Sequence, residues 1–261
     1  MSWSLAAAPH RRIGHAIEAH DAIGSTNDRA REALHELDGE GRVILAELQT
    51  AGRGRRGRTW LSPSGRNLYM SVAVVPSVAA FDAWRMGLAT ALAVADACEA
   101  VAPVGLKWPN DVVAAGDGRK LGGLLIETIA EGERLRGAVL GIGINVNWRR
   151  AEMPVELRAY ATSLADLAGA DVDREELLSR VVDGLAAEID AVEAGVSPLE
   201  RYRARCSTLG SAVSVETGEG LVTGTAIDLD ATGALVIEDA EGRRHVLSGG
   251  EVRRVRPLMP A

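Results

Sequence analysis

Four arginines lie within six residues of the segment QTAGRGRRGRTW (residues 49–60), separated by glycines. They are Arg53, Arg55, Arg56 and Arg58. Guanidinium groups form paired hydrogen bonds with carboxylates and phosphates, and glycine adopts positive φ at little cost. The pattern predicts a loop that is mobile until an anion neutralises it, with Gln49 and Trp60 offering an amide and a stacking surface. A solvated basic turn is the alternative interpretation.

A second polar cluster is KWPND, residues 107–111. Because the residue before a proline disfavours the helical conformation, Trp108 predicts an extended segment that turns between two apolar strands. The turn presents Lys107, Asn110 and Asp111 together. An ammonium there can contact phosphate, and a carboxylate can bind Mg²⁺. A salt-bridged turn explains the same residues equally well.

Two glycine-rich strand segments follow, KLGG (residues 120–123) and GIGIN (residues 141–145). Glycine within a strand leaves no side chain, so a ligand can approach the backbone closely. The second segment is not a dinucleotide fingerprint, because no helix follows and the third glycine is absent. The residues of interest are Lys120, Gly122, Gly123, Gly141, Gly143 and Asn145.

Hydrophobic periodicity and turn residues predict the elements that position these groups. Ser25 and Thr26 are candidates for the N-cap of a helix whose apolar stripe runs through Ala30, Ala33, Leu34 and Leu37. Strands are expected at 42–48 and 67–75, on both sides of a proline turn within 105–115, and as a hairpin over 120–148 that turns at 131–133. Further helices are expected at 82–101, at 173–195 and from Ser197 onward.

The sequence changes character near residue 209, where short alternating segments separated by glycine and aspartate replace the helical pattern. Such spacing is typical of a small β-barrel. We therefore expect two domains, residues 1–208 and residues 209–261. The larger one should be α+β, because its strands form hairpins rather than alternating with helices.

Composition excludes several classes of function. The chain of 261 residues carries 36 acidic and 29 basic residues, a formal net charge of −7, which argues against broad binding of nucleic acid. No apolar run approaches the roughly 18 residues that span a bilayer, and the N-terminal residues lack the charge order of a signal peptide. A cytoplasmic location without membrane attachment is expected. Cys98 lies in an apolar helical pattern and is interpreted as a buried small hydrophobe.

The order of the motifs is more specific than any one of them. GSTN (24–27), QTAGRGRRGRTWLSP (49–63), NLYMSV (67–72), LKWPNDV (106–112), KLGGLLIE (120–127) and GIGINVN (141–147) occur in sequence. This set resembles the biotin protein ligases, from about residue 25 to the C-terminal GEVRRV. The resemblance implies a class II synthetase-like catalytic domain with a mixed or antiparallel sheet, followed by an SH3-like barrel. It also implies synthesis of biotinyl-5′-AMP from biotin and ATP with Mg²⁺, and biotin transfer to a lysine of a biotin carboxyl carrier protein.

The resemblance also implies roles for individual residues. Biotin-binding residues would be Ser25, Thr26, Asn27, Gln49, Arg53, Gly54, Arg55, Lys120, Gly122 and Gly123. ATP-binding residues would be Arg56, Arg58, Trp60, Lys107, Asn110 and Asn145, with Asp111 on the Mg²⁺ side. Lys120, Arg55 and Lys107 would be catalytic. Screening the repulsion between the biotin carboxylate and the α-phosphate requires such fixed cations.

Two alternatives accompany this hypothesis. A lipoate or octanoate ligase would share the fold and the adenylation chemistry. A basic-loop protein that binds nucleic acid would need more aromatic residues beside the arginines for stacking. Because only 24 residues precede STN, we expect the monofunctional type of ligase, without a DNA-binding domain and without specific DNA binding. A homodimer, the acceptor protein and the order of biotin and ATP binding are left open.

Overall fold

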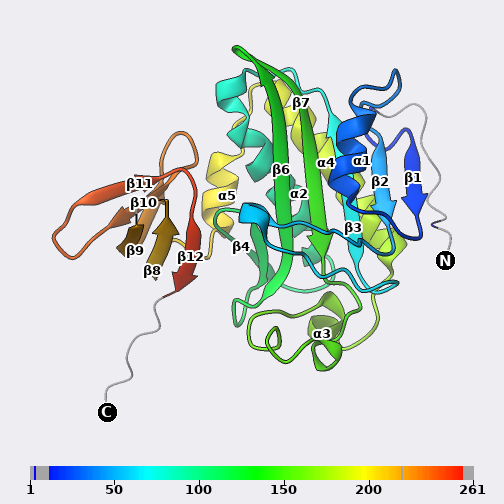
Figure 1. Ribbon diagram of the computed structural model, residues 1–261. Coiled ribbons are helices and arrows are strands. Elements are labelled where there is room, and N and C mark those ends of the chain that lie inside the picture. The colour runs from blue at the N-terminus through cyan, green and yellow to red at the C-terminus, as the bar shows by residue number, and fades with distance from the viewer. Residues whose placement is uncertain (1–2, 4–11, 219, 255–261) are drawn as a thin grey trace.

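The computed structural model describes residue 3 and residues 12–218 and 220–254. It contains a seven-stranded sheet with helices and a separate five-stranded sheet that lies to one side (Figure 1). None of the helices in these described residues is long and apolar enough to cross a membrane.

The large sheet is mixed. Its strand order is β1-β2-β3-β7-β6-β5-β4, in which β1 and β2 are parallel and every other neighbouring pair is antiparallel. The α+β class with a mixed sheet is therefore confirmed. The strands are β1 (Ile17–His20), β2 (Val43–Ala46), β3 (Leu68–Val74), β4 (Val104–Lys107), β5 (Asp111–Ala114), β6 (Lys120–Glu131) and β7 (Arg134–Ile144).

The predicted hairpin is confirmed, because β6 pairs with β7 from Gly122 to Glu131 and the chain turns at Gly132, whose φ of 58° suits glycine. The strands expected near 42–48 and 67–75 and around the proline turn are also present. Strand β1 was not predicted from the sequence. Its four residues, IEAH, contain a single β-branched side chain and are too few to show an alternating pattern.

The described residues form five α-helices, and helices lie on both faces of the large sheet (Figure 1). They are α1 (Thr26–Ala33), α2 (Trp84–Glu99), α3 (Leu164–Ala168), α4 (Arg174–Glu193) and α5 (Leu199–Arg205). Three-residue 3₁₀ helices occur at Arg55–Gly57, Ala80–Asp82 and Arg150–Glu152. The expected helices at 82–101, at 173–195 and after Ser197 correspond to α2, α4 and α5, whereas the five-residue α3 was missed because it is too short to show a period.

Helix α1 is shorter than its apolar stripe predicted. It ends at Ala33, and Leu37 is fully exposed instead of packing on the same face. The chain turns back tightly after the helix, so that a Cβ added to Gly39 would lie 1.5 Å from the carbonyl oxygen of Ala33. This turn removes Leu37 from the helical face, and the prediction that it belongs to the stripe is wrong.

The two faces of the large sheet pack against different parts of the protein. Alternate residues of a strand point to opposite faces. Val43 and Leu140 belong to the main core that includes α2 and α4, whereas Ile44 and Val139 pack in a second cluster beneath α1. Gly141 and Gly143 have the same parity as Val139, so they belong to the α1 face. The side of the sheet without a large core is therefore the one that can hold a ligand.

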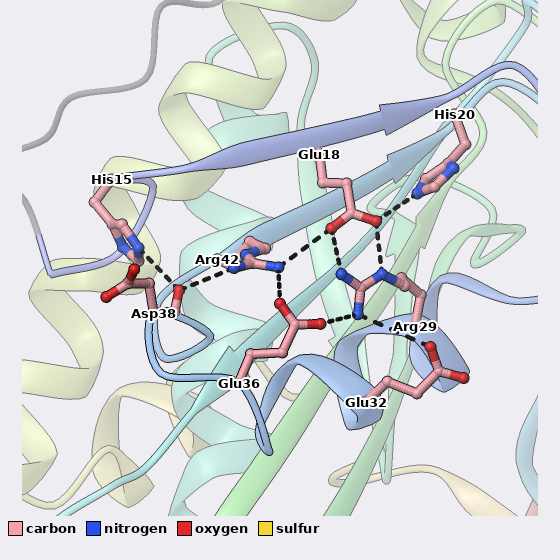
Figure 2. Close-up of polar contacts among 8 residues, drawn as sticks. All are labelled: His15, Glu18, His20, Arg29, Glu32, Glu36, Asp38 and Arg42. Carbon is pink, nitrogen blue, oxygen red and sulfur yellow. Dashed lines mark hydrogen bonds and ion pairs between the residues drawn. The ribbon is translucent and has the colours of Figure 1, made fainter.

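Ion pairs tie α1 to the edge of the sheet (Figure 2). The Arg29 guanidinium donates to Glu18 on β1 at 2.6 and 2.7 Å and to Glu36 at 2.7 Å. Arg42 lies within ion-pairing distance of the same two carboxylates. Burial alone would raise the pKa of Glu18, but hydrogen bonds from Arg29 and His20 lower that pKa below its usual value. The network holds the helix that carries Thr26 and Asn27 against β1 and β2.

The small domain is an antiparallel sheet of order β11-β10-β9-β8-β12, which confirms the expected small C-terminal β domain. Its strands are β8 (Ala212–Thr217), β9 (Gly220–Leu229), β10 (Leu235–Glu238), β11 (Arg244–Leu247) and β12 (Glu251–Arg254). The Trp108 indole donates to the Gly233 carbonyl at 3.0 Å, which joins the KWPND turn to this domain. The boundary at residue 208 stays a prediction; it falls between the end of α5 and the start of β8.

Cys98 is buried in α2, and burial raises the pKa of its thiol to about 12. At neutral pH it is a thiol and not a thiolate nucleophile. Its interpretation as a small buried hydrophobe is confirmed.

Candidate active site

A cavity of about 420 Å³ opens on the α1 face of the large sheet, and several parts of the chain line it. They include strands β6 and β7, the start of α1, the arginine loop (residues 52–60), the KWPND turn and residues 250–252 of the small domain. Of the residues predicted to bind ligands, those that line this cavity are Ser25, Thr26, Asn27, Gln49, Arg53, Gly54, Arg55, Arg56, Arg58, Trp60, Lys107, Asn110, Asp111, Lys120, Gly123 and Asn145.

Gly122 is the predicted residue that does not line the cavity. It follows Leu121 and precedes Gly123 on β6, so its Cα faces the opposite side of the sheet from Gly123. A Cβ at Gly122 would lie 2.9 Å from the carbonyl oxygen of Gly143, within the packed sheet. The structure therefore separates the two adjacent glycines, which the sequence alone does not distinguish.

The cavity floor is a pair of glycines covered by an indole. Gly123 and Gly143 are partners in the β6–β7 register. A Cβ at Gly143 would lie 2.7 Å from Cε2 of Trp60, and one at Gly123 would lie 3.0 Å from its Cζ3. The expectation that a ligand approaches the bare strand is thus revised at these positions, because Trp60 fills the cleared space.

At the other end of the cavity, Gly141 makes room for Asn27. A Cβ on Gly141 would lie only 2.1 Å from Oδ1 of Asn27. The Asn27 amide donates to the Leu125 carbonyl at 3.2 Å and to Glu127 at 2.8 Å, and the Ser71 hydroxyl lies 2.7 Å from its Oδ1. This buried side chain is therefore held in a single orientation beside the cavity.

The remaining polar groups at this end of the cavity are Gln49 and the residues at the start of α1. Gln49 accepts through Oε1 from the Thr26 backbone N–H at 2.9 Å and from the Thr26 hydroxyl at 3.1 Å. Ser25 is the N-cap residue, as predicted, but its hydroxyl makes no capping bond and is buried at the cavity. The group therefore combines hydroxyl and amide functions suited to a small polar ring.

Lys120 and Asp111 form an ion pair at 2.6 Å in the middle of the cavity. The Lys120 ammonium also lies 5.3 Å from the centroid of the Trp60 ring, within cation–π range. Asn110 donates to the Leu124 carbonyl at 2.6 Å, which fixes the KWPND turn on β6. The ammonium is thus held between a carboxylate and an aromatic face, next to the glycine floor.

The arginine loop closes over the cavity through contacts with two distant parts of the chain. Arg53 pairs with both oxygens of Asp28 on α1 at 2.7 Å. Arg58 pairs with Glu251, and Arg56 donates to the Glu216 carbonyl at 3.1 Å, both in the small domain. Arg56 has a φ of 56°, which is uncommon for a residue with a side chain and marks a constrained loop.

Arg55 differs from Arg53 and Arg58, which form ion pairs with carboxylates. Its hydrogen-bond partner among the described residues is the Asn110 amide oxygen, at 3.5 Å, rather than a carboxylate. Burial, together with the positive charge of Arg56, lowers the pKa of its guanidinium. A partly buried cation that lacks a direct carboxylate partner is a strong site for an anionic ligand.

The charge of the cavity is opposite to that of the protein. Its lining includes six basic side chains but only two acidic ones, Asp111 and Glu251, although the chain as a whole has a net charge of −7. The basic residues are Arg53, Arg55, Arg56, Arg58, Lys107 and Lys120. The site therefore favours a ligand with more than one negative charge.

Comparison with known proteins gives the family. Residues 21–145 match the family model of the Biotin/lipoate A/B protein ligase family, and residues 208–253 match that of the Biotin protein ligase C terminal domain. The chain is 41% identical to the Biotin--[acetyl-CoA-carboxylase] ligase of Mycobacterium tuberculosis over 242 residues, which cover 89% of this chain and 86% of that protein. This chain belongs to the biotin protein ligase family.

A second relative and a solved structure support the same family assignment. The Biotin--[acetyl-CoA-carboxylase] ligase of Paracoccus denitrificans is 33% identical, over 87% of this chain and 96% of that protein. The solved biotin protein ligase of Aquifex aeolicus in complex with biotin and ATP matches with a TM-score of 0.75 and 30% identity, over 92% of this chain and 99% of that one. The resemblance predicted from the sequence motifs is confirmed.

Several cavity residues of this ligase were missed by the sequence analysis. Gly250, Glu251 and Val252 are about 190 residues from the arginine loop in the sequence, and only the fold brings them to the cavity. GEVRRV marked the end of the resemblance but carried no assigned role. Ser71 and Glu127 do not line the cavity but contact Asn27, and they lay within the quoted motifs NLYMSV and KLGGLLIE without an assigned role. The apolar lining residues missed were Leu61, Leu124, Leu125, Ile142, Trp148, Leu157 and Ala161.

The predicted Mg²⁺ was tested against the donor set of the ligase. The described residues contain no group of three or more His, Cys, Asp or Glu side chains that could hold a metal ion. Asp111 is a single carboxylate, and it is paired with Lys120. Mg²⁺ commonly takes one or two carboxylates together with substrate phosphates, so these residues fit a metal that arrives with a nucleotide rather than a resident one.

Proposed function

We propose that this ligase activates biotin with ATP as biotinyl-5′-AMP, releases pyrophosphate, and transfers biotin to a lysine of a biotin carboxyl carrier domain. The observation that carries the proposal is Arg55, a partly buried guanidinium that hydrogen-bonds to no carboxylate among the described residues. It lies in the same cation-rich cavity as Lys120. Two anions can be brought together where fixed cations screen their repulsion.

In the first half-reaction, a biotin carboxylate oxygen attacks the α-phosphorus of ATP. The bond from that phosphorus to the bridging oxygen breaks, and pyrophosphate leaves with the electron pair. Lys120 and Arg55 neutralise the carboxylate and the α-phosphate and hold them in contact. In the proposal Lys107 supplies a further positive charge at the phosphates. No nucleophilic side chain is needed, which agrees with the protonated, buried Cys98.

The two ends of the cavity match the two substrates. We assign the biotin ring to Ser25, Thr26, Asn27 and Gln49, because hydroxyls and amides suit a cyclic urea. Arg53 and Gly54 would close the loop over this end, above Gly123. We assign the nucleotide to Arg56, Arg58, Trp60, Lys107, Asn110 and Asn145. Mg²⁺, when bound with ATP, would shield the phosphate charge, and Asp111 is the carboxylate that could contribute a ligand.

Loop closure also protects the intermediate. An acyl-adenylate hydrolyses readily, so water must be kept out between the two half-reactions. The contacts of the arginine loop with Asp28 and with Glu251 hold it over the cavity from both sides. In the second half-reaction the neutral amine of the acceptor lysine attacks the biotinyl carbonyl, and AMP leaves.

The test is an assay with purified protein, MgATP and an excised carrier domain. Biotin should give pyrophosphate, adenylate and biotinylated carrier, whereas lipoate and octanoate should give no labelled carrier. Labelling by lipoate with no response to biotin would instead establish the lipoate alternative, which the biotin-specific names of the relatives disfavour.

The partners follow from the same proposal. The two relatives named above are ligases of acetyl-CoA-carboxylase, so we propose the carrier domain of such a biotin-dependent carboxylase as the acceptor. Specific DNA binding is not expected, since the chain has a net charge of −7 and the loop arginines would be occupied by the adenylate. A cytoplasmic location stays a prediction, and a homodimer stays open.

A further inference from the structure

Glu127 lies just outside the cavity, on the cavity-facing side of β6. Residues 123, 125 and 127 share that side because strand residues alternate, and the first two line the cavity. The Glu127 carboxylate accepts through Oε2 from the Asn27 amide at 2.8 Å. It therefore touches a candidate biotin-ring residue without itself contacting the ligand space.

Two arginines hold the Glu127 carboxylate in place. Arg31 on α1 pairs with Oε1 at 2.9 Å, and Arg53 of the arginine loop lies 3.6 Å from Oε2. The hydrogen bond from Arg53 to Asp28 raises the pKa of the Arg53 guanidinium, and Glu127 adds to that effect. The carboxylate is thus fixed by two guanidinium groups at the point where α1, β6 and the loop meet.

This carboxylate decides which way the Asn27 amide faces. The Asn27 NH₂ group has two donors, and they are directed at Glu127 and at the Leu125 carbonyl. A flipped amide would place Oδ1 against these two acceptors and lose both hydrogen bonds, an unfavourable arrangement for a buried group. Oδ1 therefore points toward Ser71 and packs over Gly141, and the Asn27 side chain lines the cavity there.

An amide oxygen can accept two hydrogen bonds, and Ser71 supplies one. We propose that Glu127 is a positioning residue, which locks Asn27 so that the second acceptor site of Oδ1 receives a ring N–H of the biotin urea. This inference rests on the proposed function. It assigns biotin recognition to a carboxylate that the substrate does not touch, and it predicts discrimination at the ring nitrogens.

The experiment compares Glu127→Ala, Glu127→Gln and a matched control, Glu131→Gln. Glu131 is on the same strand and pairs with Arg136 at 2.6 Å on the surface, away from Asn27. Biotin affinity is measured by calorimetry without ATP, and KM for ATP is measured at saturating biotin. The second probe is biotin methylated on both ring nitrogens, which keeps the carboxylate but has no ring donor.

Glu127→Ala should weaken biotin binding roughly tenfold, the effect of one buried hydrogen bond, with KM for ATP changed less than twofold. The wild type should bind biotin at least about tenfold more tightly than the methylated ring, whereas Glu127→Ala should discriminate less than threefold. Glu127→Gln should recover most of the affinity, because its amide oxygen can accept from Asn27. Glu131→Gln should match the wild type.

Unchanged biotin affinity in Glu127→Ala would overturn the inference, as would wild-type discrimination against the methylated ring in that variant. A Glu127→Gln protein as weak as Glu127→Ala would overturn the acceptor role. Absence of biotin binding by the wild type would instead contradict the proposed function, so the two failures are distinguishable.

Discussion

Adding one methyl group to the cavity floor should disable adenylation while leaving the fold in place. In Gly143→Ala the new Cβ would lie 2.7 Å from Cε2 and 2.9 Å from Nε1 of Trp60. Carbon atoms pack at about 3.5–4 Å, so the indole must move by about 1 Å. The ring also lies over Gly123 on the neighbouring strand, where an added Cβ would be 3.0 Å from its Cζ3.

The indole must therefore lift away from the sheet, which changes its contact with the Lys120 ammonium, 5.3 Å from its ring centroid. Lys120 is tied to Asp111 and is assigned to the reacting carboxylate and phosphate. A misplacement of about 1 Å in such a site can lower the rate roughly 10²-fold. Overpacking should lower the free energy of unfolding by about 1–3 kcal/mol.

The assay is biotin-dependent pyrophosphate release at saturating biotin and ATP, together with denaturant unfolding of the same preparation. The matched control is Gly87→Ala in the first turn of α2, where the nearest atom to the added Cβ would be Cγ1 of Ile126 at 3.9 Å. That variant should keep the wild-type kcat and gain roughly 0.5–1 kcal/mol of stability, since alanine favours a helix. A Gly143→Ala enzyme with kcat within threefold of the wild type would refute the assignment of Trp60 as a fixed wall.

Three further predictions concern the cations of the cavity. Lys120→Ala should lower adenylation by roughly 10²-fold or more, the usual effect of removing a charge stabiliser; near-normal pyrophosphate release would reject its role. Arg55→Gly should release adenylate into solution roughly tenfold faster, the scale for losing a hydrogen bond to a charged group, and so biotinylate bystander lysines; a loss of turnover without free adenylate would contradict this. Residues 52–58 should exchange amide hydrogens quickly without ligand and slowly with biotin and ATP, and equal protection in both states would argue against ligand-induced ordering.

Local sequence was sufficient for most elements of the large domain. Strands such as 67–75 and the hairpin over 120–148 are bounded by glycine, proline or charged turns, and their periodicity is set by residues close in the chain. The same holds for the motif residues: Arg55, Lys107 and Lys120 could be named because chemically unusual residue types cluster within a few positions. Helix α1 is the counterexample, since its end depends on the contact between Gly39 and Ala33 rather than on its stripe.

By itself the sequence determined the family, the kinds of groups in the site and the excess of cations that it would need. Only the tertiary structure decided what each group contacts. It placed Trp60 on the glycines that had been expected to admit a ligand, turned Gly122 away from its neighbour Gly123, and brought Glu251 to the arginine loop. These outcomes depend on strand parity, on sheet register and on the docking of a second domain, which are long-range properties that spacing along the chain does not contain.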